Sequence, residues 1–101
     1  MSGYTEDYIK PVRRAIILAF LEASKGHVSN ADILMRVINR TKDGFTAYYS
    51  EAVEDLRWLE ARGYVTITGD TTVVATATPA GRRIARGENI DAGISRDIPE
   101  V

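Results

Sequence analysis

The sequence predicts a mainly helical α+β domain: three helices, then a two-stranded β-hairpin, then a short C-terminal helix. Apolar residues recur at helical spacing in residues 8–62, whereas residues 64–77 alternate apolar side chains with threonine. Glycine or a threonine–proline pair stands at most of the expected element boundaries. The 101 residues, 45% apolar and 27% charged, suit one domain with one core. We expect it over residues 8–87, between a flexible N-terminal tail (1–7) and a C-terminal tail (88–101).

The first helix is expected from about Tyr8 or Pro11 to Ser24, because proline is tolerated in a first helical turn and Gly26 can form a left-handed cap. Its apolar residues point almost all round the helix: Ile16, Ile17, Leu18, Phe20 and Leu21. Such a helix is either central in its domain or shared with another chain. We therefore expect a homodimer whose interface includes Ile17, Leu18 and Leu21, with central burial as the alternative.

The second and third helices are each expected to start at a capping residue. Ser29 and Asp32 have the spacing of a capping box, so the second helix should begin after Ser29. The third should run from about Thr46, its cap, to Arg62, and Gly63 should end it. Its inner apolar stripe would hold Tyr49, Ala52, Val53, Leu56 and Leu59.

The hairpin is expected to have a two-residue turn. Tyr64–Thr68 alternates apolar and polar residues, Gly69-Asp70 suits a type II′ turn, and Thr71–Ala77 should be the return strand. That register would place three side chains on the face that covers the helices: Val65, Ile67 and Val74. Thr78 should then cap a fourth helix, from Pro79 to about Arg86.

Two segments within this order of elements have a more specific pattern. Leu56–Val65 (LRWLEARGYV) resembles the junction between recognition helix and wing in the winged helix-turn-helix superfamily, where two leucines, a glycine and an aromatic–valine pair follow at fixed spacing. Thr78–Ala85 (TPAGRRIA) resembles the T-x-x-G segment that leaves the wing in regulators of the MarR and PadR type. The resemblance covers about residues 10–87 and implies a winged-helix fold and binding of double-stranded DNA.

Three further segments, Trp58–Val65, Ala75–Thr78 and Asp91–Arg96, resemble small proteins encoded in Mu-like phages and prophages. The tails of those proteins typically carry a G-V-x-R-P segment, whereas here Asp97-Ile98 separates Arg96 from Pro99. This resemblance implies a phage-encoded protein in the host cytoplasm and names no activity.

The residues that catalysis requires do not form a recognisable pattern. With no cysteine, disulfides, thiolate metal sites and cysteine nucleophiles are excluded, which fits a cytoplasmic protein. His27 is the single histidine and is expected on the surface. The carboxylates of Glu51, Glu54, Asp55 and Glu60 are interpreted as a solvated helix face. We therefore expect no enzyme, cofactor, metal site, small-molecule substrate or membrane span.

Because the net charge is −1, DNA binding would depend on a local patch. The start of a recognition helix enters the major groove, and there Thr46, Tyr48 and Ser50 would approach base edges. Flanking phosphates would be met by Arg36, Arg40 and Lys42. Against this, the third helix has a net charge of −2, and the expected hairpin turn contains Asp70 without a cation.

The competing hypothesis is a protein-interaction module, such as a phage assembly or regulatory adaptor, that binds no DNA. It would use Trp58 and the acidic helix face to meet a basic partner. Trp58 lies away from the inner stripe, so it is either covered by the fourth helix or tail, or exposed as an anchor for a partner or second copy.

Overall fold

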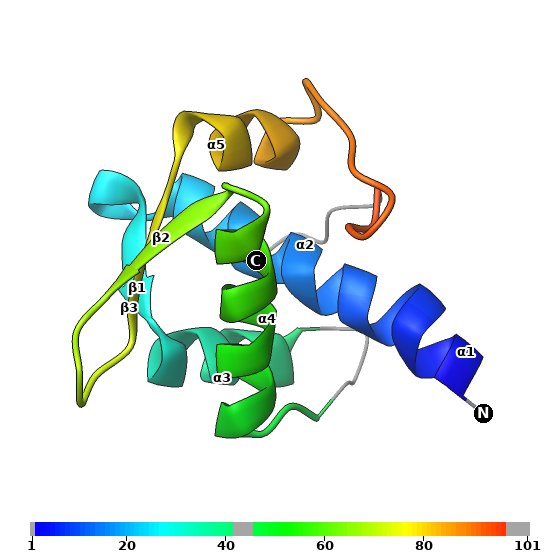
Figure 1. Cartoon of the computed structure of the whole chain (residues 1–101), viewed down its shortest axis with the longest axis horizontal. Helices are drawn as coiled ribbons and strands as arrows, with labels where there is room; N and C mark the ends of the chain where they lie inside the picture. The colour runs from blue at the N-terminus through cyan, green and yellow to red at the C-terminus, as the bar shows by residue number, and fades with distance from the viewer. Residues whose placement is uncertain (1, 42–45, 97–101) are drawn as a thin grey trace.

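The computed structural model describes residues 2–41 and 46–96, and it is a mainly helical α+β fold with a small antiparallel sheet (Figure 1). In chain order the elements are α1 (Ser2–Tyr4), the π-helical turn η1 (Thr5–Ile9), α2 (Lys10–Ala23), the 3-10 turn η2 (Lys25–His27), β1 (Val28–Asn30), α3 (Ala31–Arg40), α4 (Tyr49–Ala61), β2 (Val65–Thr68), β3 (Val74–Ala77) and α5 (Pro79–Ala85). None of the helices in the described part of the chain has the length and apolar character that a membrane span requires.

Helical backbone begins at Ser2, earlier than the expected start near Tyr8. It passes through α1 and η1 directly into α2. Lys10 Nζ lies 2.7 Å from Glu6 Oε2, one turn earlier. The rings of Tyr4 and Tyr8 are stacked, with their centroids 5.5 Å apart. Both contacts join residues four apart, which are neighbours on a helix, and so favour continuation of the helix toward the N-terminus.

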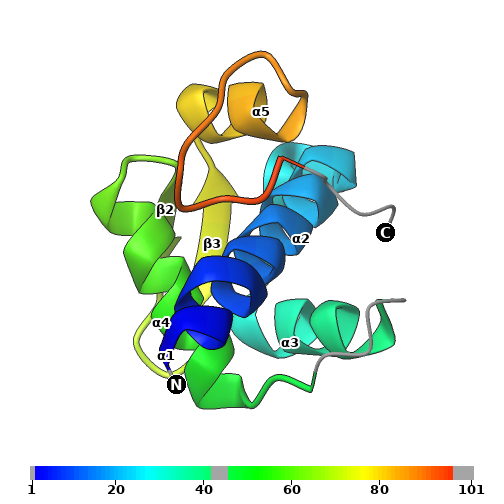
Figure 2. The same cartoon turned by 90° about the vertical axis from the view of Figure 1, so that its right-hand side faces the viewer.

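Helix α2 is the centre of the fold (Figure 2). It contacts α3, α4, α5 and β3, and these elements cover it on several sides. Ile17, Leu18 and Leu21 are consequently buried within the chain, together with Ile16. The expected dimer interface at these three residues is wrong, because one domain of this size does bury the all-round apolar helix.

Strand β1 is an element that the sequence analysis did not predict. It pairs with β3, which is the central strand in the order β1-β3-β2. Ser29 is therefore a strand residue opposite Ala75, and the predicted cap at Ser29 is wrong by one position. Asn30 caps α3 instead, since its Oδ1 accepts a hydrogen bond from Ile33 N at 2.9 Å.

The hairpin register also differs from the expected one. Val65 pairs with Ala77 and Thr68 with Val74, which leaves a loop of residues 69–73 in place of a two-residue turn. Val74 thus lies on the face opposite Val65. The reason is the third strand: Val74 also pairs with Asn30, and the neighbouring Val73 carbonyl accepts a hydrogen bond from Ala31 N at 2.9 Å. These contacts hold β3 in a register that a hairpin alone would not select.

Helix α4 begins three residues later than expected. The Glu51 carboxylate accepts the Tyr48 N–H at 2.9 Å, so Thr46 is not the cap. At the other end Gly63 has the positive φ that stops the helix, as predicted. The prediction for α5 is confirmed at its start, where Thr78 Oγ1 accepts a hydrogen bond from Gly81 N at 3.1 Å and Pro79 is the first helical residue.

The segment after α5 packs on the domain as far as residue 96. Ile94 is buried in the core, and Ser95 N donates to the Pro11 carbonyl at 3.1 Å. Trp58 is half-buried beneath this segment. The guanidinium groups of Arg14 and Arg62 lie over its ring, with their Cζ atoms 3.9 Å and 4.6 Å from the ring centroid. A Cβ at Gly93 would overlap the indole. The tail thus covers Trp58, and the alternative of an exposed anchor is wrong.

Asp91 fastens this segment, and its replacement gives a pH-dependent prediction. Its Oδ2 accepts hydrogen bonds from Tyr64 Oη at 2.6 Å and Arg62 Nη1 at 3.1 Å, while Oδ1 accepts from Gly93 N at 2.8 Å. Burial raises the pKa of Asp91, but these hydrogen bonds and the charge of Arg62 outweigh it, so the pKa lies below the ordinary value of 3.8. Asp91→Asn should cost about 1.5–3 kcal/mol at pH 7, the range for hydrogen bonds to a charged group.

A depressed carboxyl pKa stabilises the fold above the unfolded pKa and loses that effect as pH falls through the folded pKa. The difference between parent and Asp91→Asn in urea unfolding should therefore shrink below about pH 4. The control is Asp70→Asn, at an exposed aspartate, which should change stability little at either pH. An Asp91→Asn difference that is equal at pH 7 and pH 3 would contradict the assignment.

Candidate nucleic-acid interface

Helix α3 and the start of α4 form one end of the molecule, and α5 lies at the opposite end (Figures 1 and 2). The Asn39 side chain holds the connection into α4. Its Nδ2 donates to the Ala47 carbonyl at 3.2 Å, and its Oδ1 accepts from Ala47 N at 2.6 Å. Because both amide groups are used, the end of α3 and the approach to α4 keep one fixed geometry.

The side chains at the start of α4 project to solvent. Thr46 and Ser50 are exposed, and Tyr48 is 69% exposed. Tyr49, expected on the inner stripe, is exposed as well, so that expectation is wrong. Tyr49 is the first residue of α4, and the buried stripe starts only at Ala52. Hydroxyl and aromatic groups therefore cluster at this end.

Two of the three predicted phosphate contacts lie on α3. Arg36 and Arg40 are both exposed and, being four residues apart, share one side of the helix. Arg36 Nη2 lies 3.1 Å from Asp32 Oδ2, whereas Arg40 has no ion pair among residues 2–41 and 46–96. Lys42 lies outside the described residues. Among the described residues, one unpaired and one paired positive charge are therefore present on this side.

The acidic residues of α4 mostly face α2, which the sequence analysis did not anticipate. Glu51 lies 3.5 Å from Arg13, Glu54 lies 3.5 Å from Lys10, and Asp55 forms a buried pair with Arg13. Glu51 and Glu54 stay 39% and 64% exposed, and Lys10 is shared with Glu6 at 2.7 Å, so the cations of α2 offset this acidic charge only in part. The charge of −2 counted over residues 46–62 thus overstates the negative charge available to a ligand, although Glu54 and Glu60 remain exposed.

Arg57 is a basic residue of the outer face that the sequence analysis missed. It follows Ser50 by seven residues, so at about 100° per residue the two share one side of α4. Its side chain is 62% exposed, and its Nη1 lies 3.9 Å from Glu60 Oε1. The seven-residue spacing was visible in the sequence and could have found it.

The loop 69–73 offers no positive charge to a phosphate. It contains Asp70 and neither lysine nor arginine, and Asp70, Thr71 and Thr72 are exposed. At this end of the molecule, contacts with nucleic-acid phosphates would therefore come from α3 and α4 rather than from the hairpin.

Two regions outside this interface bear on the binding of small ligands. His27, expected on the surface, is half-buried, with Nδ1 3.2 Å from the Leu21 carbonyl. The described residues contain no cluster of histidine and carboxylate side chains that could hold a metal ion. A cavity of about 160 Å³ is lined by residues of α5 and of the segment after it, including Ile84, Ile94 and Arg96. His27 Nδ1 also lies 4.0 Å from Glu22 Oε1, and the lining of the cavity also includes Asp91 and Ser95.

Comparison with protein-family models and with curated proteins finds no match for this chain. The candidate interface is therefore supported by its own geometry: an exposed helix start with hydroxyl and aromatic groups, and exposed arginines on α3 and α4.

Proposed function

We propose that this chain is a winged-helix DNA-binding protein, not an enzyme, that presents the outer face of α4 to the major groove of double-stranded DNA. The carrying observation is the exposed start of α4, with its hydroxyl and aromatic groups and with Arg57 two turns further on. Three of the four acidic residues of α4 contact cations of α2, while Glu54 and Glu60 remain exposed. The three-stranded sheet and the Asn39 clamp between α3 and α4 support the same arrangement.

In this proposal the start of α4 contacts bases and α3 contacts phosphates. Thr46, Tyr48 and Ser50 approach base edges from the first turn, and Arg57 does so from two turns further on. Arg36, Arg40 and Lys42 neutralise flanking phosphates. The resemblance to proteins of Mu-like phages supports a phage-encoded regulator or DNA-associated protein as the setting.

The proposal gives a quantitative expectation for salt. Each neutralised phosphate contributes a slope of about −0.9 in log affinity against log salt concentration, so three contacts give about −2.7. The test is fluorescence anisotropy of a labelled duplex over a salt series. Arg36→Ala combined with Arg40→Ala should lower affinity at least about tenfold at low salt and reduce the slope by about 2.

The matched control is Lys25→Ala combined with Arg96→Ala, which removes two exposed positive charges outside α3 and α4. It should keep most of the affinity. If the double variant in α3 binds as well as the parent at matched salt, or if the control loses as much affinity, the assignment to this face is wrong.

A protein-interaction module is the second candidate function, and the exposed tyrosines at the start of α4 favour it. Tyr48 and Tyr49 are both exposed, and tyrosine is a residue type enriched at interfaces. The version that relied on Trp58 and an acidic face loses its basis, because Trp58 is covered and the acids are paired. Under this candidate the arginine variants would be silent, and Tyr48→Ala would remove the partner.

A further inference from the structure

Three arginines occupy the outward side of α5 and its cap, far from α3. Gly81 and Ile84 are buried and define the inner side of this helix. At about 100° per residue, Arg82, Arg83 and Arg86 fall within roughly 100° of one another on the opposite side. We call these three residues the arginine face. Its charge contrasts with the chain as a whole, whose net charge is −1.

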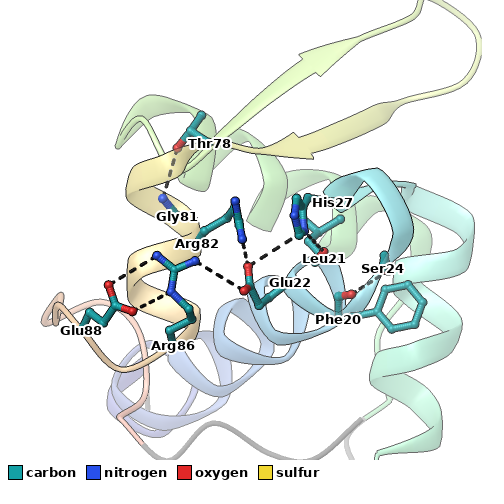
Figure 3. Close-up of polar contacts among 10 residues, drawn as sticks. All are labelled: Phe20, Leu21, Glu22, Ser24, His27, Thr78, Gly81, Arg82, Arg86 and Glu88. Carbon is teal, nitrogen blue, oxygen red and sulfur yellow. Dashed lines mark hydrogen bonds and ion pairs between the residues drawn. The ribbon is translucent and has the colours of Figure 1, made fainter.

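Two carboxylates partly neutralise the arginine face (Figure 3). Glu22 of α2 bridges two arginines, with Oε1 2.9 Å from Arg82 Nε and Oε2 3.5 Å from Arg86 Nη1. Glu88 accepts from Arg86 Nε at 2.7 Å and from Nη2 at 3.3 Å. The hydrogen bond from Arg82 lowers the pKa of Glu22, and that from Arg86 lowers the pKa of Glu88. Both acids are therefore ionised at neutral pH.

With three arginines and two carboxylates, the arginine face keeps one positive charge in excess. Arg83 is exposed and has no ion pair within residues 2–41 and 46–96. The side chains of Arg82 and Arg86 remain about a third exposed, and each guanidinium carries five N–H donors. The two-point contact of Arg86 with Glu88 is the geometry by which arginine also grips phosphate. The face therefore has both surplus charge and donors available for an external anion.

We propose that the arginine face is a second nucleic-acid surface, which binds the phosphate backbone of a duplex at the end of the molecule opposite the candidate site on α3 and α4. A duplex fits better than an isolated anion, because its charges are spaced about 1.7 Å apart along the axis and it gains from counterion release. The inference extends the proposed function: a chain with both surfaces can hold two DNA segments at once. Glu22 and Glu88 compete with the phosphates and keep this second contact weak.

The test isolates the arginine face by using the full chain with Arg36→Ala and Arg40→Ala as background. Residual binding of a short labelled duplex is measured by anisotropy at low salt. Adding Arg83→Glu should lower that binding about tenfold, since one phosphate contact is lost and a repulsion is added. Adding Glu88→Gln should strengthen it, because the amide releases Arg86 without a change of shape. A gain of affinity cannot come from misfolding.

The matched control is Lys25→Glu, the same change of charge at an exposed residue outside both proposed surfaces, which should leave the residual binding unchanged. A second readout is a bridging assay. In it, duplex DNA fixed to beads captures a second, labelled duplex only when the protein binds both. In the otherwise unaltered chain, Arg83→Glu should abolish bridging and keep binding of a single duplex.

The outcomes separate this inference from the proposed function. If the arginines of α3 are silent but Arg83→Glu removes binding, the proposed site fails and the arginine face stands. If neither Arg83→Glu nor Glu88→Gln changes residual binding or bridging, the arginine face is overturned. Binding of polyglutamate in place of duplex DNA would also overturn it, in favour of an acidic protein partner.

Discussion

Replacing Asp55 by alanine should lower the free energy of unfolding by about 3–5 kcal/mol. Asp55 is 1% exposed and bonds Arg13 through both oxygens, with Oδ2 2.7 Å from Nε and Oδ1 3.1 Å from Nη2. Arg14 Nε, which is buried, lies 3.9 Å from Oδ1. Without the carboxylate, Arg13 would keep only the partly exposed Glu51, 3.5 Å away, and Arg14 would have no ion pair within residues 2–41 and 46–96. Since small domains are stable by only about 5–15 kcal/mol, much of the folded population should be lost.

Urea unfolding measures this loss of stability, and two further variants serve as comparisons. Asp32→Ala also removes one partner of an ion pair, but Asp32 is exposed, and the cost should stay within about 1 kcal/mol. Arg13→Met combined with Asp55→Leu removes both charges of the hydrogen-bonded pair, leaves Arg14 buried, and should recover part of the stability. If Asp55→Ala costs no more than Asp32→Ala, the buried pair does not have the role assigned to it.

Asp55 also shows why the sequence analysis misplaced an acidic residue. It was interpreted as part of a solvated face, although at about 100° per residue it falls only about 40° from the buried Leu59 and about 60° from the buried Ala52 of α4. A carboxylate at such a position is tolerated only with a counter-charge. That counter-charge is Arg13, 42 residues earlier in the chain, and one sequence does not reveal such a pairing.

Features set by local chemistry were predicted, and features set by distant partners were not. The positive φ at Gly26 and Gly63 and the capped start at Thr78 follow from residue type and position alone. Strand β1 has only three residues and exists because β3 pairs with it. The same pairing set the hairpin register. Short strands of this kind leave too little pattern to detect in one sequence.

In the candidate interface too, features set by local sequence could be predicted and features set by distant partners could not. The exposure of Arg36, Arg40 and Tyr48 could be predicted, because helical periodicity and the buried stripes determine it. The direction of the acidic side chains on α4 could not, because it depends on Lys10 and Arg13 of α2. The contact between Asn39 and Ala47 was equally hidden, since an asparagine near a helix end has many possible partners.

Gly81→Ala should destabilise the protein, although alanine is the better helix former by about 1 kcal/mol. Gly81 is buried in α5, and a Cβ there would overlap the backbone carbonyl oxygen of Tyr64. That oxygen is fixed in place, because it accepts a hydrogen bond from Thr78 N at 3.0 Å. Neither side can yield without separating α5 from the start of β2. We expect a cost of about 1–3 kcal/mol, the usual range for an overpacked core site, in thermal or urea unfolding.

Ala80→Gly is the matched control, since it makes the reverse exchange at the neighbouring position of α5. It should cost at most about 1 kcal/mol, the difference in helix propensity. The two exchanges test one physical claim: at residue 81 the space beside Tyr64 outweighs the preference for helix. This would also explain the glycine of the T-x-x-G segment, where Thr78 caps the helix and Gly81 lets it lie against the strand. A Gly81→Ala variant as stable as the parent, or more so, would show that the backbone can shift and that the close approach is not required.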